Sequence, residues 1–530
     1  MRTTQLSLLG GLCLLLSAPI QAQPGALDPS FNNSGYVIQP VNGKDGVQKI
    51  LVQPDQKILS IGMSWDAGYT ARAYVFRYLP DGTPDPDFGT AGVFMYELDN
   101  EALLYSAVIT STGKILLVGS TTDYQTYRMM LIQLNADGTL DAAFGTNGVA
   151  LQSVSLVGPN AEDMAFDVTL DDQENILVCG SSYDTNYVRR PVVVRFTPDG
   201  TLDNTFGVDG VATIPVMLVG ASAFQGIVVQ PDGKIVATGF FGQTELWYTL
   251  LLVRFNADGS LDPTFSTDGI VKHNYGNVDD AGYDLKLTAD GSILVAGKTV
   301  TVTYNYSALL MKFTPDGEVD TAFGTAGAVE EDLADFDYAW NVELQADGKI
   351  IIAGTSGVGP PNGFDLAVWK YASDGTADAA FGTNGLAHYA IGDYYTMIYG
   401  LDVQADGKIL IGGQARTANN ENYFFTARLQ NDIASGLANA SAPAEALVFP
   451  NPASVGSMVM LDAVEPIQAG ARIDLLATDG RQVGTYRAAQ LERNAGRVGL
   501  MLPASVTPGV YQLVLQQPGT RVVSTIVITD

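Results

Sequence analysis

The sequence predicts an all-β protein: a seven-bladed β-propeller of four-stranded blades, followed by a small C-terminal β-sandwich. Three observations predict this fold class. One motif recurs seven times at nearly constant intervals, each repeat consists of short strand-like runs, and the two ends of the repeat array complement each other. A chain of 530 residues exceeds one ordinary domain and can hold a large repeat unit plus a smaller domain.

The recurring motif reads D-x-x-F and is usually followed by G-x-x-G, as in LDAAFGTNG at 140–148. Consecutive copies lie 56 to 62 residues apart. We expect the aspartate to accept hydrogen bonds from backbone N–H groups two or three residues later, the phenylalanine to enter the core, and the glycine to permit a chain reversal. The structural residues of the repeat are therefore Asp28, Phe31, Asp85, Phe88, Asp141, Phe144, Asp203, Phe206, Asp262, Phe265, Asp320, Phe323, Asp378 and Phe381.

The repeated carboxylates have a second interpretation, which is calcium binding by D-G-x-x-D segments such as Asp137 with Asp141. These segments lack the dense oxygen-ligand spacing of a calcium loop. The sequence therefore favours the structural role and predicts no metal-binding or cofactor-binding residue, with calcium kept as the alternative.

Each repeat is expected to contain four strands, for example near 104–110, 114–119, 128–134 and 148–152. Short apolar runs that are partly β-branched and end in glycine are typical of strands. The P-D-G segment in VVQPDGKIVATG indicates a hairpin between two of them. Four-stranded units at a regular period predict blades that bury their sheet faces against their neighbours.

The ends of the array predict how the ring closes. The repeats begin near Leu27 with the motif that ends a repeat, and they stop after FFTARLQND, where another D-x-x-F would be due. The strand near 35–39 is therefore expected to pair with 423–429 and to complete the seventh blade. Closure of this kind removes two exposed sheet edges.

These motifs, together with Q-x-D-G-K-I-x-x-x-G, resemble the delta-60 repeat family over about 27–430. The resemblance implies a seven-bladed β-propeller. That family has no agreed biochemical function, so the resemblance sharpens the fold and leaves the role open.

The first 22 residues have the features of a secretory signal peptide. Arg2 precedes an apolar run from Leu6 to Leu16, Pro19 breaks the run, and cleavage is expected after Ala22. No other apolar stretch is long enough to span a bilayer, so no transmembrane segment is predicted. The net charge of -29 makes nucleic acid an unfavourable partner.

The C-terminal part differs from the repeats in composition and pattern. After the propeller at 23–432, a small polar stretch at 433–443 is expected to be a linker, and 444–530 is expected to form the β-sandwich. VFPNPAS at 448–454 and the later segments resemble the type A C-terminal sorting domain of the type IX secretion system. The motif positions are Pro450, Asn451, Pro452, Gly480, Gly509 and Tyr511.

The sorting resemblance implies passage through the periplasm, contact with the type IX secretion machinery, and a secreted or outer cell-surface location. Whether the mature protein is released or stays attached is left open. The tail departs from the family pattern because it contains no Lys, and Arg521 fills only part of the usual basic end.

No catalytic residue is predicted, because the two histidines, His273 and His388, lie far apart and no nucleophile elbow or metal motif occurs. We expect a monomeric, non-enzymatic binding or adhesion module, with a hydrolase or lyase acting on polysaccharide as the alternative. Aromatic or Gly/Pro-rich segments at 181–191, 239–248, 301–308, 354–365 and 392–400 are expected to gather on one rim, where a glycan or surface protein could bind. Carboxylates with raised pKa in a deep pocket would favour the enzyme.

Overall fold

The computed structural model describes 23–98, 101–122, 126–154, 162–184, 187–215, 220–242, 247–275, 279–359 and 363–431 of the propeller. In the tail it describes 447–449, 453–455, 457–462, 472–477, 482–487, 492–494, 497–503, 506, 509–517 and 520–529. These residues form strands and turns, and among them no helix is long and apolar enough to cross a membrane.

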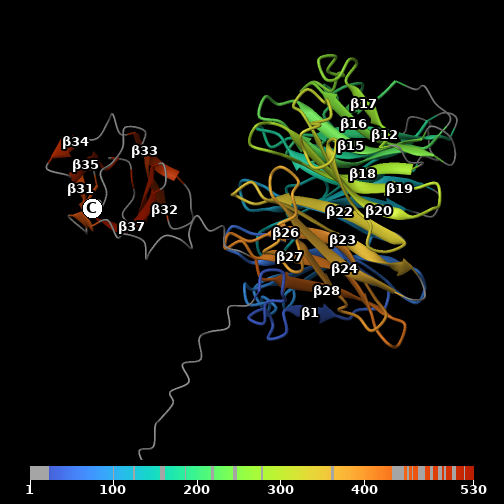
Figure 1. Cartoon of the computed structure of the whole chain (residues 1–530), viewed down its shortest axis with the longest axis horizontal. Coiled ribbons are helices and arrows are strands. Elements are labelled where there is room, and N and C mark those ends of the chain that lie inside the picture. Colours follow the sequence, from blue (N-terminus) through green and yellow to red (C-terminus); the bar gives the residue numbers. More distant parts are fainter. Residues whose placement is uncertain are drawn as a thin grey trace, which may run out of the picture.

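Seven antiparallel units of four strands make up the propeller, as the sequence predicts (Figure 1). Blade one contains β2 (Asp45–Val52), β3 (Ile58–Trp65), β4 (Ala71–Tyr78) and β5 (Val93–Tyr96). Blade two contains β6 (Glu101–Ile109), β7 (Ile115–Thr122), β8 (Tyr127–Leu134) and β9 (Val149–Gln152). Blade three contains β10 (Met164–Leu170), β11 (Ile176–Tyr183), β12 (Arg189–Phe196) and β13 (Val211–Thr213). Blade four contains β14 (Ser222–Val229), β15 (Ile235–Gly242), β16 (Tyr248–Phe255) and β17 (Ile270–His273).

The remaining blades repeat the same order. Blade five contains β18 (Asp279–Leu287), β19 (Ile293–Val300), β20 (Tyr306–Phe313) and β21 (Ala328–Glu331). Blade six contains β22 (Phe336–Leu344), β23 (Ile350–Gly359), β24 (Gly363–Tyr371) and β25 (Leu386–Tyr389). Blade seven contains β26 (Tyr395–Val403), β27 (Ile409–Arg416), β28 (Asn422–Leu429) and, as its outer strand, β1 (Tyr36–Gln39).

The predicted closure of the ring is confirmed. β1 runs antiparallel to β28, with Tyr36 opposite Ala427 and Gln39 opposite Phe424. Figure 1 shows the blue β1 beside the orange β28, although the two strands come from opposite ends of the propeller sequence. The pairing satisfies backbone groups that would otherwise form an open sheet edge.

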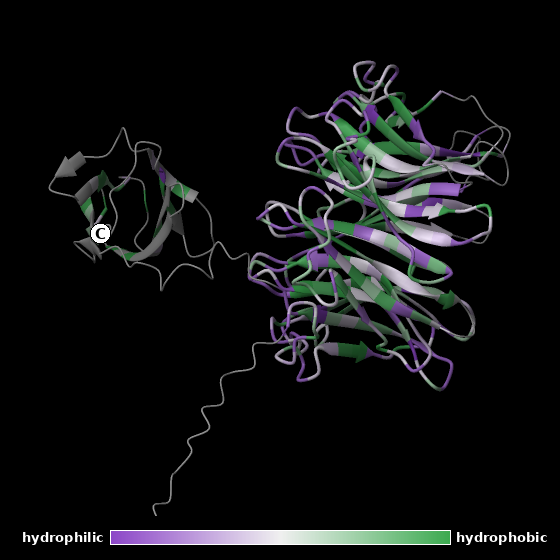
Figure 2. Ribbon diagram, viewed as in Figure 1, coloured by the Kyte–Doolittle hydropathy of each residue, from purple (hydrophilic) through white to green (hydrophobic). Residues whose placement is uncertain are grey.

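The apolar core lies between neighbouring blades. In one cluster, Leu59 and Val75 of blade one pack against Leu104 and Leu117 of blade two, and all four side chains are fully buried. Cys179 is fully buried on β11 in a similar cluster with blade four. Figure 2 shows apolar residues concentrated along the strands and polar residues in many of the turns. Burial of each such side chain stabilises the fold by about 1.5–3 kcal/mol.

The two rims of the ring are built from different connections. The motif rim consists of the hairpins between the first and second strands and the D-x-x-F segments between the third and fourth strands. The variable rim consists of the turns between the second and third strands and the crossings into the next blade. The first strands of neighbouring blades lie against one another and surround the central channel.

In the tail, the described strands form two sheets. One contains β29 (Leu447–Phe449), β31 (Met458–Asp462), β35 (Arg497–Met501) and β34 (Glu492–Asn494). The other contains β30 (Ala453–Ser454), β37 (Thr520–Thr529), β36 (Gly509–Gln517), β32 (Arg472–Ala477) and β33 (Gln482–Arg487). Buried residues from both sheets, such as Val459 and Leu513, share one core, which is the arrangement of a β-sandwich.

Candidate functional site

The repeated aspartates lie on the motif rim and are held by donors on both carboxylate oxygens. In every copy, one oxygen accepts the backbone N–H of the residue two positions later. The other oxygen faces a cation from the third strand of the same blade in six of the seven copies. These pairs are Arg77 with Asp85, Arg195 with Asp203, Arg254 with Asp262, Lys312 with Asp320, Lys370 with Asp378 and Arg428 with Asp28.

The environment of Asp262 shows how the motif works electrostatically. Its carboxylate lies 2.7 Å from Arg254 Nε and 3.0 Å from Lys234 Nζ. Burial alone would raise the pKa of Asp262, but the hydrogen bonds from Thr264 and the two cations lower it well below its usual range. Asp262 is therefore an ionised structural group at neutral pH.

The motif also fastens each blade to the next one. Phe265 is fully buried, and the guanidinium of Arg254 lies 4.6 Å from the centre of its ring. Arg254 donates to the carbonyl of Pro315 in blade five at 2.6 Å. Gly317, with φ of 87°, covers the same ring so closely that a Cβ there would lie 2.7 Å from Phe265. Only glycine fits this contact without a shift.

The copy in blade two differs, because Gln133 occupies the position of the third-strand cation. Asp141 is paired instead with Lys114 of the first hairpin at 2.6 Å. All seven motif phenylalanines are at most 1% exposed. Among the described residues, no group of three His, Cys, Asp or Glu side chains is placed to hold a metal ion.

Most of the sorting motif lies outside the described residues. Pro450, Asn451, Pro452 and Gly480 belong to this undescribed part, as do the signal peptide and the linker. Gly509 begins β36, and Tyr511 on the same strand is 5% exposed and pairs with Ile526 of β37. Gly509 and Tyr511 thus occupy an inner strand of the tail sandwich.

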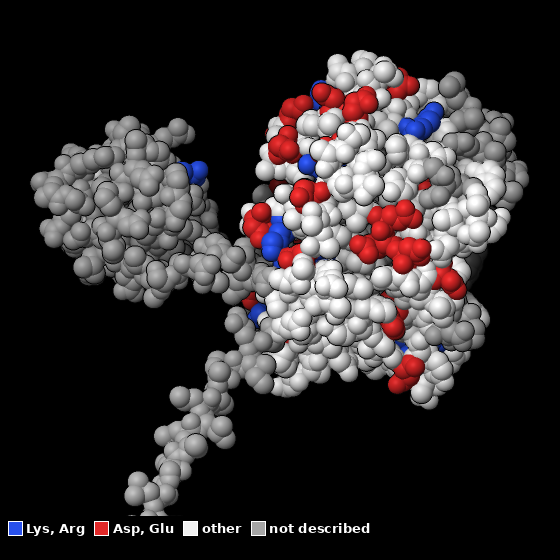
Figure 3. Space-filling view, in the orientation of Figure 1, with Lys and Arg blue, Asp and Glu red and all other residues white. Residues whose placement is uncertain are grey.

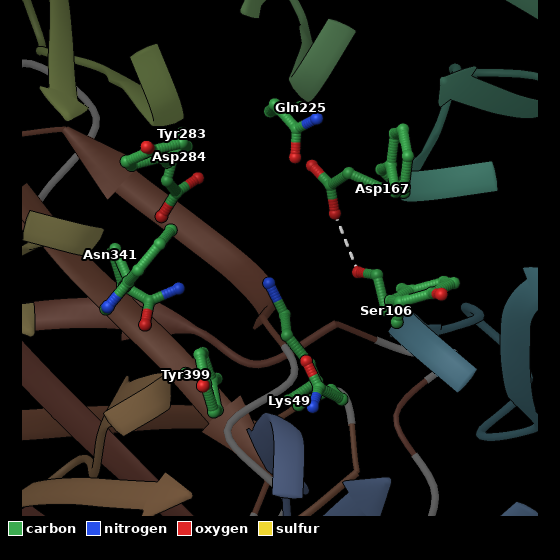
Figure 4. Close-up of a pocket in the computed structure, with 12 residues that line it drawn as sticks. Lys49, Ser106, Asp167, Gln225, Tyr283, Asp284, Asn341 and Tyr399 are labelled. Atoms are coloured by element: carbon green, nitrogen blue, oxygen red, sulfur yellow. Dashed lines mark hydrogen bonds between the residues drawn. The ribbon is translucent and has the colours of Figure 1, made fainter. Parts of the chain in front are cut away.

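A pocket lies in the central channel of the described propeller. Every first strand carries a β-bulge at the same height, between Val47 and Lys49 in β2 and between Ala339 and Asn341 in β22, for example. A bulge re-aims side chains, and bulges occur frequently next to functional sites. The residues at these bulges line a cavity of about 260 Å³ and are Gln48, Lys49, Tyr105, Ser106, Phe166, Asp167, Gln225, Tyr283, Asp284, Trp340, Asn341 and Tyr399 (Figure 4).

One wall of the channel pocket is aromatic. The rings of Tyr283 and Trp340 have centroids 4.4 Å apart, and Trp340 and Tyr399 lie 5.8 Å apart. Tyr105 and Phe166, from blades two and three, form a second aromatic pair at 5.6 Å. Burial raises the pKa of Tyr105 and Tyr399 to about 12, so both phenols are neutral at physiological pH. The pocket therefore offers flat apolar faces with hydroxyl groups at their edges.

Polar groups converge on the same cavity. Trp340 Nε1 and Asn341 Oδ1 are buried, and within the described part of the chain neither atom has a hydrogen-bond partner. Buried polar atoms of this kind call for an explanation, because an unmade hydrogen bond costs about 1–3 kcal/mol. Lys49 extends from β2 into the pocket in Figure 4. The pocket lining thus includes Lys49 and two residues, Trp340 and Asn341, whose side chains each hold one buried polar atom without a partner in the described part of the chain.

Two carboxylates in the pocket are engaged by the protein itself. Asp167 accepts a hydrogen bond from the Ser106 hydroxyl at 2.6 Å and another from the Ile227 N–H of blade four at 3.1 Å. Burial raises the pKa of Asp167 above its ordinary value. Asp284 accepts the Leu285 N–H and, at 3.0 Å, the Val342 N–H of blade six. Both carboxylates therefore tie one first strand to the next.

The channel below the pocket is charged. Two residues beyond Asp284 along β18, Lys286 forms an ion pair of 2.5 Å with Glu343 of β22. The carboxylates of Glu343, Asp284 and Asp402 hold the pKa of Lys286 above its ordinary value, although burial acts in the opposite direction. Asp402 in turn accepts the Val52 N–H of blade one at 2.7 Å. The Lys286 ammonium is thus paired within the protein.

Where the structure describes them, the expected rim segments consist largely of strand ends. The segment 354–365, for example, contains the end of β23 and the start of β24, and its residues 360–362 lie outside the described part of the chain. Tyr399, which falls in the segment 392–400, lies on β26 and lines the channel. His273 and His388 lie on the outer strands β17 and β25, away from the pocket.

The fold and the site define a seven-bladed β-propeller with an aromatic pocket on its axis. The family model described as "Domain of unknown function (DUF5122) beta-propeller" matches seven stretches of the chain, at 53–88, 110–144, 175–206, 230–265, 288–323, 345–381 and 404–432. The chain therefore carries seven repeats of this family, one for each blade. No curated protein matches the chain.

Several solved structures are distantly similar. PorZ, described as a surface component of the type-IX secretion system of Porphyromonas gingivalis, is 13% identical with a TM-score of 0.41, and the match covers 93% of this chain and 61% of PorZ. A PL25 ulvan lyase is 9% identical with a TM-score of 0.42, over 74% of this chain and 96% of the lyase. A GH93 α-L-arabinofuranosidase of Fusarium graminearum is 9% identical with a TM-score of 0.38, over 61% and 92%. This chain thus spans 61% of the PorZ chain, and none of these likenesses carries an argument about function.

Proposed function

We propose that this protein is an exported, non-enzymatic binding protein whose channel pocket holds a neutral glycan. The observation that carries the proposal is the combination of the Tyr283–Trp340–Tyr399 wall with two unpartnered polar atoms, Trp340 Nε1 and Asn341 Oδ1. Binding sites for small ligands are concave, mostly apolar and aromatic, with a few placed polar groups that fix orientation. The channel pocket has this composition.

A sugar ring suits these groups chemically. Its C–H faces carry partial positive charge and pack against the negative faces of aromatic rings. Its hydroxyls both donate and accept, so one can accept the Trp340 N–H while another donates to Asn341 Oδ1. Both atoms are buried in the ligand-free structure, so the Trp340 and Asn341 side chains must shift slightly as the sugar enters; a hydroxyl at each position then satisfies an atom that has no partner in the described structure.

The charge of the protein favours a neutral ligand. The chain carries a net charge of -29, and Figure 3 shows more acidic than basic groups on the described part of the visible face. Inside the pocket, the Lys49 ammonium is balanced by the carboxyl groups of Asp167 and Asp284. A polyanionic ligand would be repelled at long range and would meet no excess of cations in the pocket.

Export rests on the two ends of the sequence. The signal-peptide features at 1–22 and the sorting-domain resemblance at 444–530 support passage to the periplasm and then through the type IX machinery. We propose a secreted or outer cell-surface location on this basis. A glycan-binding propeller at that location would act as an adhesin or a glycan-capturing module.

One observation favours the alternative of a polysaccharide hydrolase or lyase. Asp167 has a raised pKa and faces the same pocket as Asp284, and such carboxylate pairs perform acid–base chemistry on sugars. The hydrogen bonds of both carboxylates to neighbouring strands argue against this reading, because a general acid or base must be free to exchange its proton. The binding role therefore fits the pocket better.

The test is a glycan array with the purified full chain, run with and without calcium. We expect wild type to bind neutral glycans, Trp340→Ala to abolish this binding, and Tyr96→Ala on the outer strand β5 to leave it intact. Calcium should make no difference. Absence of binding, or equal binding by wild type and Trp340→Ala, would refute the proposal.

The enzyme alternative is tested on the glycans found by the array. The protein is incubated with each one and released sugar ends are measured. We expect no release by wild type. Release by wild type that disappears in Asp167→Asn would establish the hydrolase or lyase instead.

A further inference from the structure

Three tyrosines on the variable rim adopt a backbone conformation that bulky residues avoid. Tyr69, Tyr187 and Tyr304 have φ of 63°, 58° and 61°. Each stands in the turn between the second and third strands, in blades one, three and five. In each turn the tyrosine N–H donates to the carbonyl three residues earlier, at 2.8–3.0 Å. The left-handed region is strained for an aromatic residue, and strain of this kind clusters at functional sites.

The chain contains its own comparison for this turn. The hairpins of the motif rim have the same hydrogen bond, and five of the seven use glycine at the strained position: Gly113, Gly233, Gly291, Gly348 and Gly407. The other two use Gln56 and Glu174. In blade seven, the turn on the variable rim uses Asn420, with φ of 67°. Glycine and asparagine relieve the strain, so tyrosine in three blades runs against the local preference.

Packing of these side chains within the protein does not offset the strain. Tyr69, Tyr187 and Tyr304 are 68%, 64% and 66% exposed. Among the residues that the structure describes, the cation contact of these rings is that of Lys44 Nζ, which lies 3.6 Å from the centre of the Tyr69 ring. Backbone strain that no contact within the protein offsets indicates that these side chains have a functional role, such as binding another molecule. Three exposed rings on one rim are suited to contact with a partner.

The turn that holds Tyr304 in blade five leads into a strand whose aromatic contacts reach the channel pocket. Two positions after Tyr304, the ring of Tyr306 lies 5.6 Å from that of Tyr338. Tyr338 in turn stacks on Trp340 at 5.0 Å with an angle of 11° between the ring planes. A series of aromatic contacts therefore runs from Tyr306, next to the rim turn, to Trp340 in the wall of the pocket. The partner on the rim and the ligand of the pocket can be one continuous molecule.

We propose that the channel pocket and the rim tyrosines Tyr69, Tyr187 and Tyr304 bind one neutral polysaccharide, with the pocket holding a few sugar units and the rim contacting the rest of the chain. This inference rests on the proposed function and adds that the ligand is a polymer. Several weak contacts on one chain raise affinity through effective concentration. Affinity should therefore depend on the length of the glycan.

The test compares polymers with short fragments. The probes are cellulose, xylan, mannan, β-1,3-glucan and amylose, each with its hexasaccharide. We expect wild type to bind one polymer at least ~10-fold more tightly than the matching hexasaccharide. The triple variant Tyr69→Asn, Tyr187→Asn and Tyr304→Asn should lose that advantage while binding the hexasaccharide as wild type does. Its thermal midpoint should be equal to that of wild type or higher, because asparagine tolerates the turn.

The matched control relieves strain on the opposite rim. The double variant Gln56→Gly and Glu174→Gly changes the same turn position in blades one and three, and should bind polymer as wild type does. Wild-type polymer affinity in the tyrosine triple variant would overturn the inference and point to a protein partner for the rim. Loss of hexasaccharide binding in Trp340→Ala would at the same time leave the proposed function standing. Absence of binding to every probe by wild type would overturn both.

Discussion

The motif aspartates allow a sharp test of how the D-x-x-F motif stabilises the contact between neighbouring blades. The same aspartate position is paired with a buried arginine in blade four and with a more exposed lysine in blade two. Asp262 faces Arg254, whose side chain is 6% exposed, whereas Asp141 faces Lys114, whose side chain is 36% exposed. Asp262→Ala leaves a buried guanidinium without its carboxylate, which costs about 3–5 kcal/mol. Asp141→Ala removes chiefly a backbone cap and costs about 0.5–2 kcal/mol.

The assay is urea unfolding of the purified protein, followed by tryptophan fluorescence. We expect the transition midpoint to fall further in Asp262→Ala than in Asp141→Ala, by an amount equivalent to about 2 kcal/mol. Equal midpoints for the two variants, or a larger loss in Asp141→Ala, would refute the view that the buried Arg–Asp pair sets the stability of each fastening.

The pairing of Asp262 also predicts that the stability of the folded protein depends on pH. The pKa of Asp262 is lower in the folded protein than in the unfolded chain, where it is about 3.9. Its contribution to stability is therefore complete above the unfolded pKa and is lost as the pH falls toward the folded pKa. The stability difference between wild type and Asp262→Asn should be constant from pH 7 to pH 5 and should shrink below about pH 4.

Three further predictions concern closure, calcium and export. Deletion of 23–40 removes β1 and should give a protein that aggregates or melts below wild type, because the edge of β28 becomes exposed; an unchanged melting temperature would contradict the closure role. Millimolar calcium should not restore the stability lost in Asp141→Ala, and a rise in the wild-type midpoint by several degrees that is absent from the variant would instead indicate a metal site. A chain truncated after 432 should accumulate as a folded propeller in the periplasm. When 433–530 is fused to an unrelated periplasmic protein, the fusion should reach the surface in a host with type IX machinery. Normal amounts of the truncated chain at the surface would exclude the tail as the sorting signal.

The blade architecture was predictable from the sequence because each blade repeats the same local chemistry. Expected strands at 104–110 and 128–134 appear as Glu101–Ile109 and Tyr127–Leu134. The pairing of β1 with β28 followed from where the array begins and ends. The partner of each motif aspartate did not follow, because Arg254 and Asp262 meet through a strand and a turn whose register the sequence does not specify.

The channel pocket was missed because it takes only one or two residues from each blade. Its signal is a column in the aligned repeats, just after the start of each first strand, which reads Gln48, Tyr105, Phe166, Gln225, Tyr283, Trp340 and Tyr399. Five of these seven residues are aromatic, and the position before each of the seven is small or apolar. The β-bulge that turns these side chains inward is a feature of backbone geometry, and residue types alone do not predict it.

We propose above that the channel pocket binds a neutral glycan. The most direct measurement is a crystal structure of the full chain with the best-binding oligosaccharide from the array. We predict a sugar ring packed on Trp340, with hydroxyls hydrogen-bonded to Trp340 Nε1 and Asn341 Oδ1. A ligand bound on the motif rim, or one that leaves the Tyr283–Trp340–Tyr399 wall uncovered, would contradict it.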